Sequence, residues 1–201
     1  MNAMDPGLRE ELLHMAATDQ DARQRLDCHP HHDGAMSEQE LATAEHLRAV
    51  DAANTARMKR IVAERGWPGR SLVGEDGAQA AWLLVQHADH DPAFQRACLE
   101  LLSHAVQAGE ADARQQAYLT DRVLLAEGNP QRYGTQFMLV GGSWQPRPLT
   151  DPDHVDERRR QVGLEPLPTT GNDSSSPTPR RWGPSRLTDR EAPRPRLIHN
   201  S

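Results

Sequence analysis

Apolar residues recur every three or four positions through most of this chain, and glycine or proline stands where the repetition stops. Such spacing places apolar side chains on one face of an α-helix, which turns once every ~3.6 residues. Four amphipathic helices are predicted, over residues 5–26, 37–65, 91–108 and 111–127. Local signals mark two of their starts. Ser37 with Glu40 has the form of a capping box, and Asp91-Pro92 that of an N-cap followed by proline.

Three further segments complete the predicted fold. Residues 77–88 contain an apolar run from Ala80 to Val85, which is typical of a central helix buried on all sides. After Gly128, residues 133–149 predict a β-hairpin that turns on two glycines, and residues 152–162 predict a last short helix. We therefore expect residues 1–164 to form a compact, all-α (mainly α) multi-helix domain with one small β-hairpin.

Residues 165–201 differ from the rest in composition. They hold seven prolines, a run of three serines and no periodic apolar pattern, so we expect a disordered tail rich in Pro, Arg and Ser. The six arginines of this tail exceed its four acidic residues, whereas residues 1–164 carry eight more acidic than basic residues. An acidic body argues against binding to the phosphates of a nucleic acid.

Nothing in the sequence predicts export or insertion into a membrane. No run of about 18 apolar residues is present to span a bilayer, and the first ten residues lack the pattern of a secretory signal. Cys28 and Cys98 form neither a disulfide framework nor a Cys-x-x-Cys site, which fits a reducing compartment. We expect a cytoplasmic protein without nucleic-acid or membrane partners, and the sequence names no protein partner.

Polar side chains interrupt the predicted apolar faces of several helices. They are Asp19, Asp51, Asn54, Gln86, His87, Asp121 and Arg122. A buried polar group without a partner costs about 1–3 kcal/mol, and an unpaired buried charge costs more. Because four helices contribute such residues, we expect these side chains to meet. Asp121 or Asp19 would then pair with Arg122 and His87.

His87 and Asp121 are the candidate catalytic residues. Beside a carboxylate, His87 would act as a general base, oriented by Asp121 or Asp51. The other candidates would bind a small molecule in a polar pocket between the helices, closed by the hairpin. They are Asp19, Asp51, Asn54, Gln86, Asp89, Arg122, Gln131, Tyr133 and Gln136. The alternative is that the same residues form a structural network of ion pairs that fixes the register of the helices.

Motifs for metals, nucleotides and nucleophiles are absent from the sequence. Histidines and aspartates gather at residues 29–33 and 87–91, but without the spacing of His-Glu-x-x-His or paired-cysteine zinc sites. Neither a Walker loop nor a Gly-x-Gly-x-x-Gly turn is present, and no Gly-x-Ser-x-Gly elbow supplies a nucleophile. We therefore expect no metal and no cofactor.

Several short motifs together carry a family resemblance. They are Asp19-Gln20 with Arg23, Asp51-x-x-Asn54, Gly66-Trp67-Pro68, Val73-Gly74, Gln86-His87-Ala88-Asp89, Leu119-Thr120-Asp121-Arg122, Gln131-x-Tyr133-Gly134-Thr135-Gln136, and Asp156-x-x-Arg159 with Gly163-Leu164. In these motifs the chain resembles a bacterial family of unknown function, the one numbered 6624, from about Leu8 to Leu167. The resemblance implies a shared fold and implies no particular activity.

Two functional hypotheses follow. The first is a small-molecule-binding protein or cofactor-independent enzyme, of the hydrolase or proton-transfer type, whose polar pocket centres on His87 and Asp121. The second is a non-catalytic helical interaction or accessory module in which the polar cluster is structural and a partner binds elsewhere. An exposed, contiguous apolar patch would favour the second.

Overall fold

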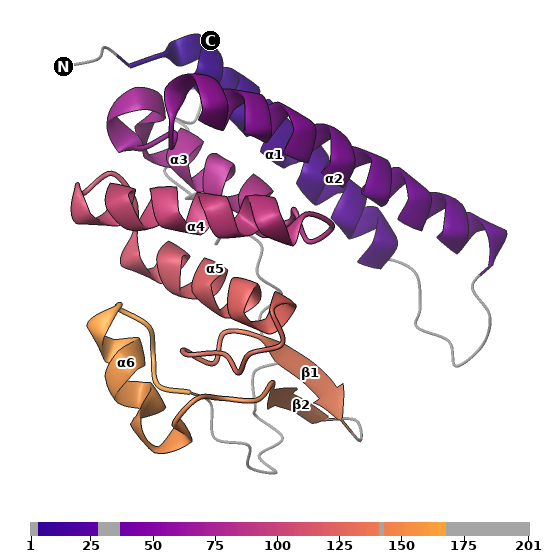
Figure 1. Ribbon diagram of the computed structural model, residues 1–201. Coiled ribbons are helices and arrows are strands. Elements are labelled where there is room, and N and C mark those ends of the chain that lie inside the picture. Colours follow the sequence, from indigo (N-terminus) through magenta and orange to yellow (C-terminus); the bar gives the residue numbers. More distant parts are fainter. Residues whose placement is uncertain (1–3, 28–36, 141–142, 168–201) are drawn as a thin grey trace, which may run out of the picture. The chain divides into compact units, whose positions relative to one another are not determined.

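Six α-helices and one β-hairpin make up the part of the chain that the structure describes, which confirms the mainly α-helical prediction (Figure 1). The structure is a computed structural model and describes residues 4–27, 37–140 and 143–167. The longer helices are α1 (Pro6–Asp27), α2 (Glu38–Arg65), α3 (Arg70–Gln86), α4 (Pro92–Gln107) and α5 (Ala113–Ala126). The remaining elements are β1 (Phe137–Val140), β2 (Ser143–Pro146), the 3₁₀ turn η1 (Pro152–His154) and α6 (Val155–Gln161).

Local sequence signals set the ends of these helices. The predicted capping box is confirmed at α2, where the Glu40 amide donates to the Ser37 hydroxyl and the Glu40 carboxylate accepts from the Ser37 amide. Asp91 caps α4 as predicted, because its carboxylate accepts from the amide of Phe94. The α2 helix runs unbroken to Arg65, and Gly66 follows it with φ at 71°. Glycine tolerates that backbone conformation at little cost.

The central helix α3 begins earlier than the apolar pattern predicts. We expected residues 77–88, whereas the helix runs from Arg70 to Gln86 and bends at Gly74, where φ is 73° and ψ is 173°. Gly74 and Gly77 interrupt the apolar pattern, but the helix continues past both residues. At Gly77 a Cβ atom would lie 2.9 Å from the Cβ of Val73, so glycine gives the room that the bend needs.

The hydrophobic core surrounds α3, as its apolar run predicts. This helix packs against α1, α2, α4 and α5, and every residue from Ala80 to Val85 is buried. Its neighbours contribute fully buried side chains to the same cluster: Leu12 from α1, Met58 and Ile61 from α2, Leu102 from α4 and Leu119 from α5. Figure 1 shows α1 and α2 as a pair of long neighbouring helices.

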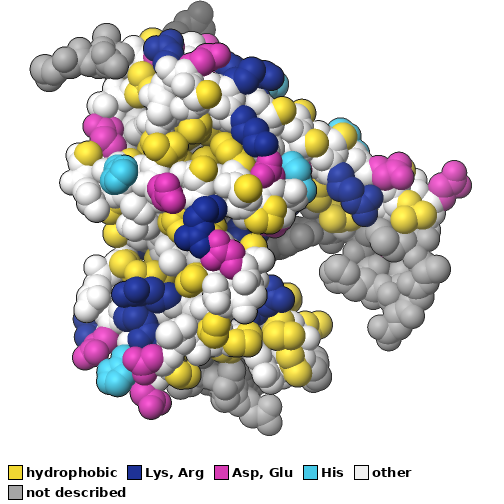
Figure 2. All heavy atoms as spheres, viewed as in Figure 1, with side chains coloured by type: hydrophobic (Ala, Val, Ile, Leu, Met, Phe, Trp, Pro, Cys, Tyr) yellow, Lys and Arg dark blue, Asp and Glu magenta, His cyan; other side chains and the backbone are white. Residues whose placement is uncertain are grey.

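The predicted β-hairpin is confirmed, over a shorter range than residues 133–149. Its two strands are antiparallel, with Leu139 opposite Trp144. Leu139 is 59% exposed and Trp144 is 48% exposed, and Met138 and Val140 are also exposed. Figure 2 shows hydrophobic side chains gathered over this hairpin. The described hairpin therefore carries a small apolar surface.

Some predictions fall on residues that lie outside the described ranges. They are the loop over residues 28–36, the glycine turn at residues 141–142 and the expected tail from residue 168 onward. Contacts of the folded domain extend to Leu167, whose amide donates to the carboxylate of Asp156 at 2.7 Å. Within the described residues, no helix is both long enough and apolar enough to cross a membrane.

Candidate functional site

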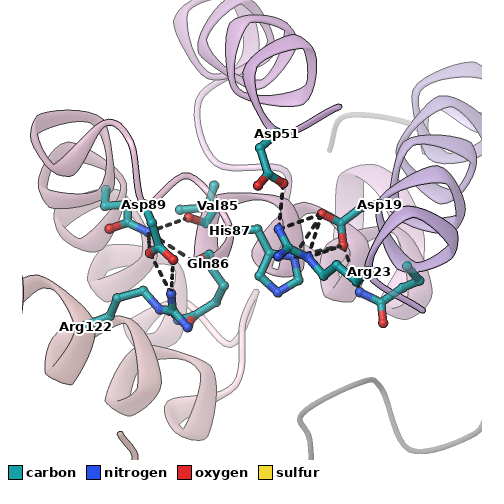
Figure 3. A network of polar contacts seen from close by, with 10 residues as sticks. Asp19, Arg23, Asp51, Val85, Gln86, His87, Asp89 and Arg122 are labelled. Atoms are coloured by element: carbon teal, nitrogen blue, oxygen red, sulfur yellow. Dashed lines mark hydrogen bonds and ion pairs between the residues drawn. The ribbon is translucent and has the colours of Figure 1, made fainter. Parts of the chain in front are cut away.

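A carboxylate and an imidazole meet where α3 ends. His87 is the residue at the C-terminal cap of α3, and Asp19 projects from the middle of α1. The two Asp19 oxygens lie 3.0 and 2.8 Å from Nδ1 of His87 (Figure 3). Asp19 is 0% exposed, whereas the His87 side chain is 15% exposed. The carboxylate thus holds the inner edge of a ring that still reaches solvent.

Arg23 joins this pair to a third helix. It lies one turn after Asp19 on α1, and its Nε is 3.3 and 3.2 Å from the two Asp19 oxygens. Its Nη2 donates to Asp51 of α2 at 2.6 Å. Arg23 Nε also lies 3.0 Å from Nδ1 of His87. The ring can accept from Arg23 only without a proton on Nδ1, and can donate to Asp19 only with one.

The two carboxyl groups beside Arg23 have opposite pKa shifts. Burial alone would raise the pKa of Asp19, but the hydrogen bond and charge of His87, together with Arg23, hold it below the ordinary 3.8. Burial raises the pKa of Asp51 above 3.8, because the charge of Arg23 does not fully offset the desolvation and the repulsion from Asp19. Of these two carboxyl groups, Asp19 is therefore the one that stays deprotonated to the lower pH.

A second set of polar side chains adjoins His87 through Gln86. Arg122 of α5 donates from Nε to the side-chain oxygen of Gln86 at 3.0 Å. Its Nη1 lies 2.6 Å from both oxygens of Asp89. Figure 3 shows Gln86 and His87 turned toward different neighbours, Arg122 on one side and the Asp19–Arg23 pair on the other. We call the following residues the α3 C-terminal cluster: Asp19, Arg23, Asp51, Gln86, His87, Asp89 and Arg122.

Gln95 secures the chain segment that carries this cluster. Its Nε2 donates to the backbone oxygens of Val85 and Gln86, both at 3.1 Å, and to Asp89 at 3.2 Å. The last carbonyls of a helix lack partners within the helix, so Gln95 satisfies groups that would otherwise be unpaired. Gln95 is almost fully buried, and it holds the end of α3 against α4.

Asp121 lies in a different set of contacts from His87. Its Oδ1 accepts from the amides of Arg132 and Tyr133 at 2.7 and 2.9 Å. Its Oδ2 accepts from the amide and the hydroxyl of Thr135, both at 2.9 Å. The structure therefore pairs Asp19 with His87, and it places Asp121 as the acceptor that shapes the loop after α5.

The predicted ligand-binding residues Gln131, Tyr133 and Gln136 belong to that same loop. Gln131 Nε2 donates to the backbone oxygen of Gln136 at 2.9 Å and its Oε1 accepts from the amide of Gln136 at 2.9 Å. The carbonyl of Tyr133 accepts from Arg159 at 2.6 Å. These contacts are internal to the polypeptide and hold the approach to the hairpin in place.

A comparison with protein-family models decides where the chain belongs. The model of the family of unknown function DUF6624 matches residues 6–170. The chain belongs to the DUF6624 family. Comparisons with curated proteins and with solved structures match nothing.

In this DUF6624 domain two predicted site residues contain buried polar atoms without partners. Asn54 of α2, which lies outside the α3 C-terminal cluster as defined, is 9% exposed, and its Nδ2 has no hydrogen-bond partner among the described residues. The same holds for Nε2 of Gln86, which is 4% exposed. A buried donor without an acceptor costs about 1–3 kcal/mol. Such donors are therefore the atoms that a ligand would satisfy.

Three residues that hold the site side chains were not among the predicted site residues of the DUF6624 domain. Arg23 belongs to the α3 C-terminal cluster, Gln95 donates to Val85 and Asp89, and Thr135 donates to Asp121. The i, i+4 spacing from Asp19 was a usable signal for Arg23, whereas Gln95 and Thr135 carried no local signal. Among the described residues, no three His, Cys, Asp or Glu side chains are grouped so that they could hold a metal ion.

Proposed function

We propose that this domain binds a small molecule at the α3 C-terminal cluster and acts on it by hydrolysis or proton transfer without a cofactor. His87 is the general base, acting through Nε2, and Asp19 is its positioning carboxylate. The supporting observation is the contact between the buried Asp19 carboxylate and Nδ1 of His87. With the Nδ1 proton donated to Asp19, Nε2 carries the lone pair that takes a proton.

The surroundings of His87 support this role. Nε2 makes no hydrogen bond to any described residue, and the side chain keeps an exposed edge. A carboxylate on Nδ1 orients the ring and stabilises the imidazolium that forms when Nε2 takes a proton. Arg23 keeps Asp19 charged by lowering its pKa together with His87. The Asp19 contact therefore favours a base that is held in one orientation.

Water is the nucleophile that fits a hydrolytic reaction at this site. Cys98 is buried, and burial raises the pKa of its thiol to about 12, so it is a poor nucleophile. Within the described residues, no serine or threonine hydroxyl hydrogen-bonds to a side chain of the cluster. In this proposal, Nε2 of His87 takes a proton from a water molecule or from a carbon acid of the substrate.

Turnover of simple esters and anilides tests the proposal. We would assay p-nitrophenyl acetate, p-nitrophenyl butyrate and p-nitroacetanilide with the full chain. The comparison is His87→Gln against His90→Gln, because His90 is an exposed neighbour on the same segment. We expect His87→Gln to lower kcat/KM by about 100-fold or more, and His90→Gln to leave it unchanged. Equal rates for the two variants would refute a base at His87.

The exposed hairpin favours a second candidate function, an interaction module whose polar cluster is structural. Met138, Leu139, Val140 and Trp144 are all exposed on one small hairpin, and an apolar patch of this kind is typical of a protein contact surface. The stability of His87 and Asp19 variants separates the two candidates, because a purely structural pair would lose stability when either residue is removed.

A further inference from the structure

The amide nitrogen of Gln86 is a buried donor of the cluster. The Gln86 residue is only 4% exposed, and its Nε2 has no hydrogen-bond partner among the described residues. Three other buried polar atoms in the described chain share this property: Asn54 Nδ2, Thr55 Oγ1 and Trp67 Nε1. Gln86 is the one whose side chain is bonded into the cluster that contains His87.

Arg122 fixes which half of the Gln86 amide is free. Its Nε is 3.0 Å from Oε1 of Gln86, and a guanidinium can only donate. Turning the amide over would place an NH₂ group against that donor, so the oxygen must face Arg122. The NH₂ group therefore points away from Arg122 without an acceptor.

Two other buried glutamines show that such an amide is ordinarily satisfied in this fold. Gln95 Nε2 donates to Val85, Gln86 and Asp89. Gln131 Nε2 donates to the backbone oxygens of Gln136 and Arg147, both at 2.9 Å. Gln86 departs from both although it is buried to a similar degree. Its free donor is thus a feature of this site and not of buried glutamines in the domain.

The charges of the cluster limit what can bind there. Arg23 and Arg122 carry positive charges, whereas Asp19, Asp51 and Asp89 are carboxylates. With a neutral imidazole, one negative charge is in excess. A phosphate dianion would meet this excess at close range and would be repelled. A carbonyl oxygen would accept from Gln86 Nε2 without adding charge, and a single carboxylate would add only one negative charge.

We propose that Gln86 Nε2 donates to a carbonyl-type oxygen of the ligand, a neutral carboxamide or ester or a single carboxylate, beside His87. The inference rests on the proposed function and names the chemical class of its substrate. Gln86 and His87 are consecutive residues at the end of α3, where the His87 side chain keeps an exposed edge. Gln86 is then a binding residue, and Arg122 positions it by occupying Oε1.

The side-chain amide signals of the full chain in ¹⁵N NMR test this assignment directly. The probes are acetamide, sodium acetate and inorganic phosphate, each titrated at constant ionic strength. We expect the Gln86 NH₂ signals to shift and saturate with acetamide, acetate or both, and not with phosphate. The NH₂ signals of Gln95 and Gln131 serve as internal controls and should stay unchanged, because their donors are already used.

The variant Gln86→Glu removes the donor and adds a carboxylate. It keeps an acceptor for Arg122 and nearly the same shape, and it replaces NH₂ by oxygen. The His87 ring signals report binding in this variant as in the wild type. We expect the response of His87 to acetate and acetamide to fall at least tenfold in apparent affinity, while the folded spectrum is retained. Gln131→Glu is the control for adding a carboxylate to a buried glutamine elsewhere, and a loss restricted to Gln86→Glu supports the assignment.

Three results would overturn the assignment. They are an unchanged Gln86 signal with acetamide and acetate, a phosphate response at equal or lower concentration, and undiminished binding by Gln86→Glu. Cross-peaks from Gln86 to water alone, without any probe response, would show that only a water molecule satisfies the donor. Failure of the proposed function looks different: the Gln86 shifts would persist, while the ester and anilide assays would show no dependence on His87.

Discussion

The carboxylate of Asp19 on α1 lies 2.8 Å from Nδ1 of His87 at the end of α3, across 68 residues of chain. Asp19 remains partnered if His87 is removed, because Gln20 Nε2 donates to its Oδ2 at 2.8 Å and Arg23 donates to both oxygens. Because of this redundancy, we expect the stability of the fold to depend little on the imidazole. It leads to a direct test of a functional against a structural role.

Thermal unfolding of His87→Ala and Asp19→Ala forms the first prediction. We expect each variant to change the free energy of unfolding by about 1 kcal/mol or less, because the remaining partners of the cluster still pair with one another. Asp21→Ala, on the exposed face of α1, is the matched control. A loss of several kcal/mol in both variants, with little further loss in the double variant, would instead identify a structural pair.

The acid dependence of stability is the second prediction. The folded pKa of Asp19 is lowered below 3.8, so its contribution to stability is present above pH 3.8 and is lost as the pH falls through the folded value. In Asp19→Asn this acid-dependent loss should disappear. Denaturant unfolding at closely spaced pH values below about 5 measures the slope, and unchanged slopes would contradict the shift.

Asp51→Asn should behave in the opposite sense, which is the third prediction. The folded pKa of Asp51 is raised above 3.8, so the folded state takes up a proton more readily than the unfolded state. The resulting penalty is absent below pH 3.8 and grows as the pH rises through the folded pKa. Asp51→Asn removes this penalty, so its stability relative to the wild type should improve across that rise. The same unfolding series measures it, and a relative decline would contradict the prediction.

Asp121→Ala tests the assignment of that residue to the loop after α5, as the fourth prediction. It would leave the amides of Arg132, Tyr133 and Thr135 without their acceptor. With three amides at about 1–3 kcal/mol each, we expect a total loss of roughly 3–9 kcal/mol in chemical denaturation. The His87 ring signals should keep their wild-type chemical shifts in the folded variant. Altered shifts of those signals would show that Asp121 acts on His87 after all.

The hairpin supplies the fifth prediction. Leu139→Thr and Trp144→Thr remove apolar surface that is already exposed to water, so each should change the free energy of unfolding by about 0.5 kcal/mol or less. Both should reduce association at high protein concentration, as measured by sedimentation velocity. Losses above about 2 kcal/mol would mean that these side chains stabilise the isolated domain.

Local chemistry explains why most of the helices could be predicted. The capping box at Ser37 and the cap at Asp91 act through hydrogen bonds to residues three positions along the chain, so neighbours in sequence are sufficient to identify them. The start of α3 was missed because Gly74 ends the periodic pattern, whereas the helix continues through a bend at that residue. Packing of α3 against the surrounding helices outweighs the local preference of glycine.

The sequence by itself determined that this chain forms amphipathic helices, a short hairpin and a set of polar residues on faces that should be apolar. Only the tertiary structure decided which of those residues meet. Asp19 and Asp121 were equivalent as partners for His87, because each is a carboxylate on a helix with apolar neighbours. Asp19 pairs with His87 because α1 packs along α3. Asp121 instead accepts from backbone amides of the loop that follows α5. The positions of those amides depend on the path of the backbone through the loop, which the spacing of apolar residues does not predict.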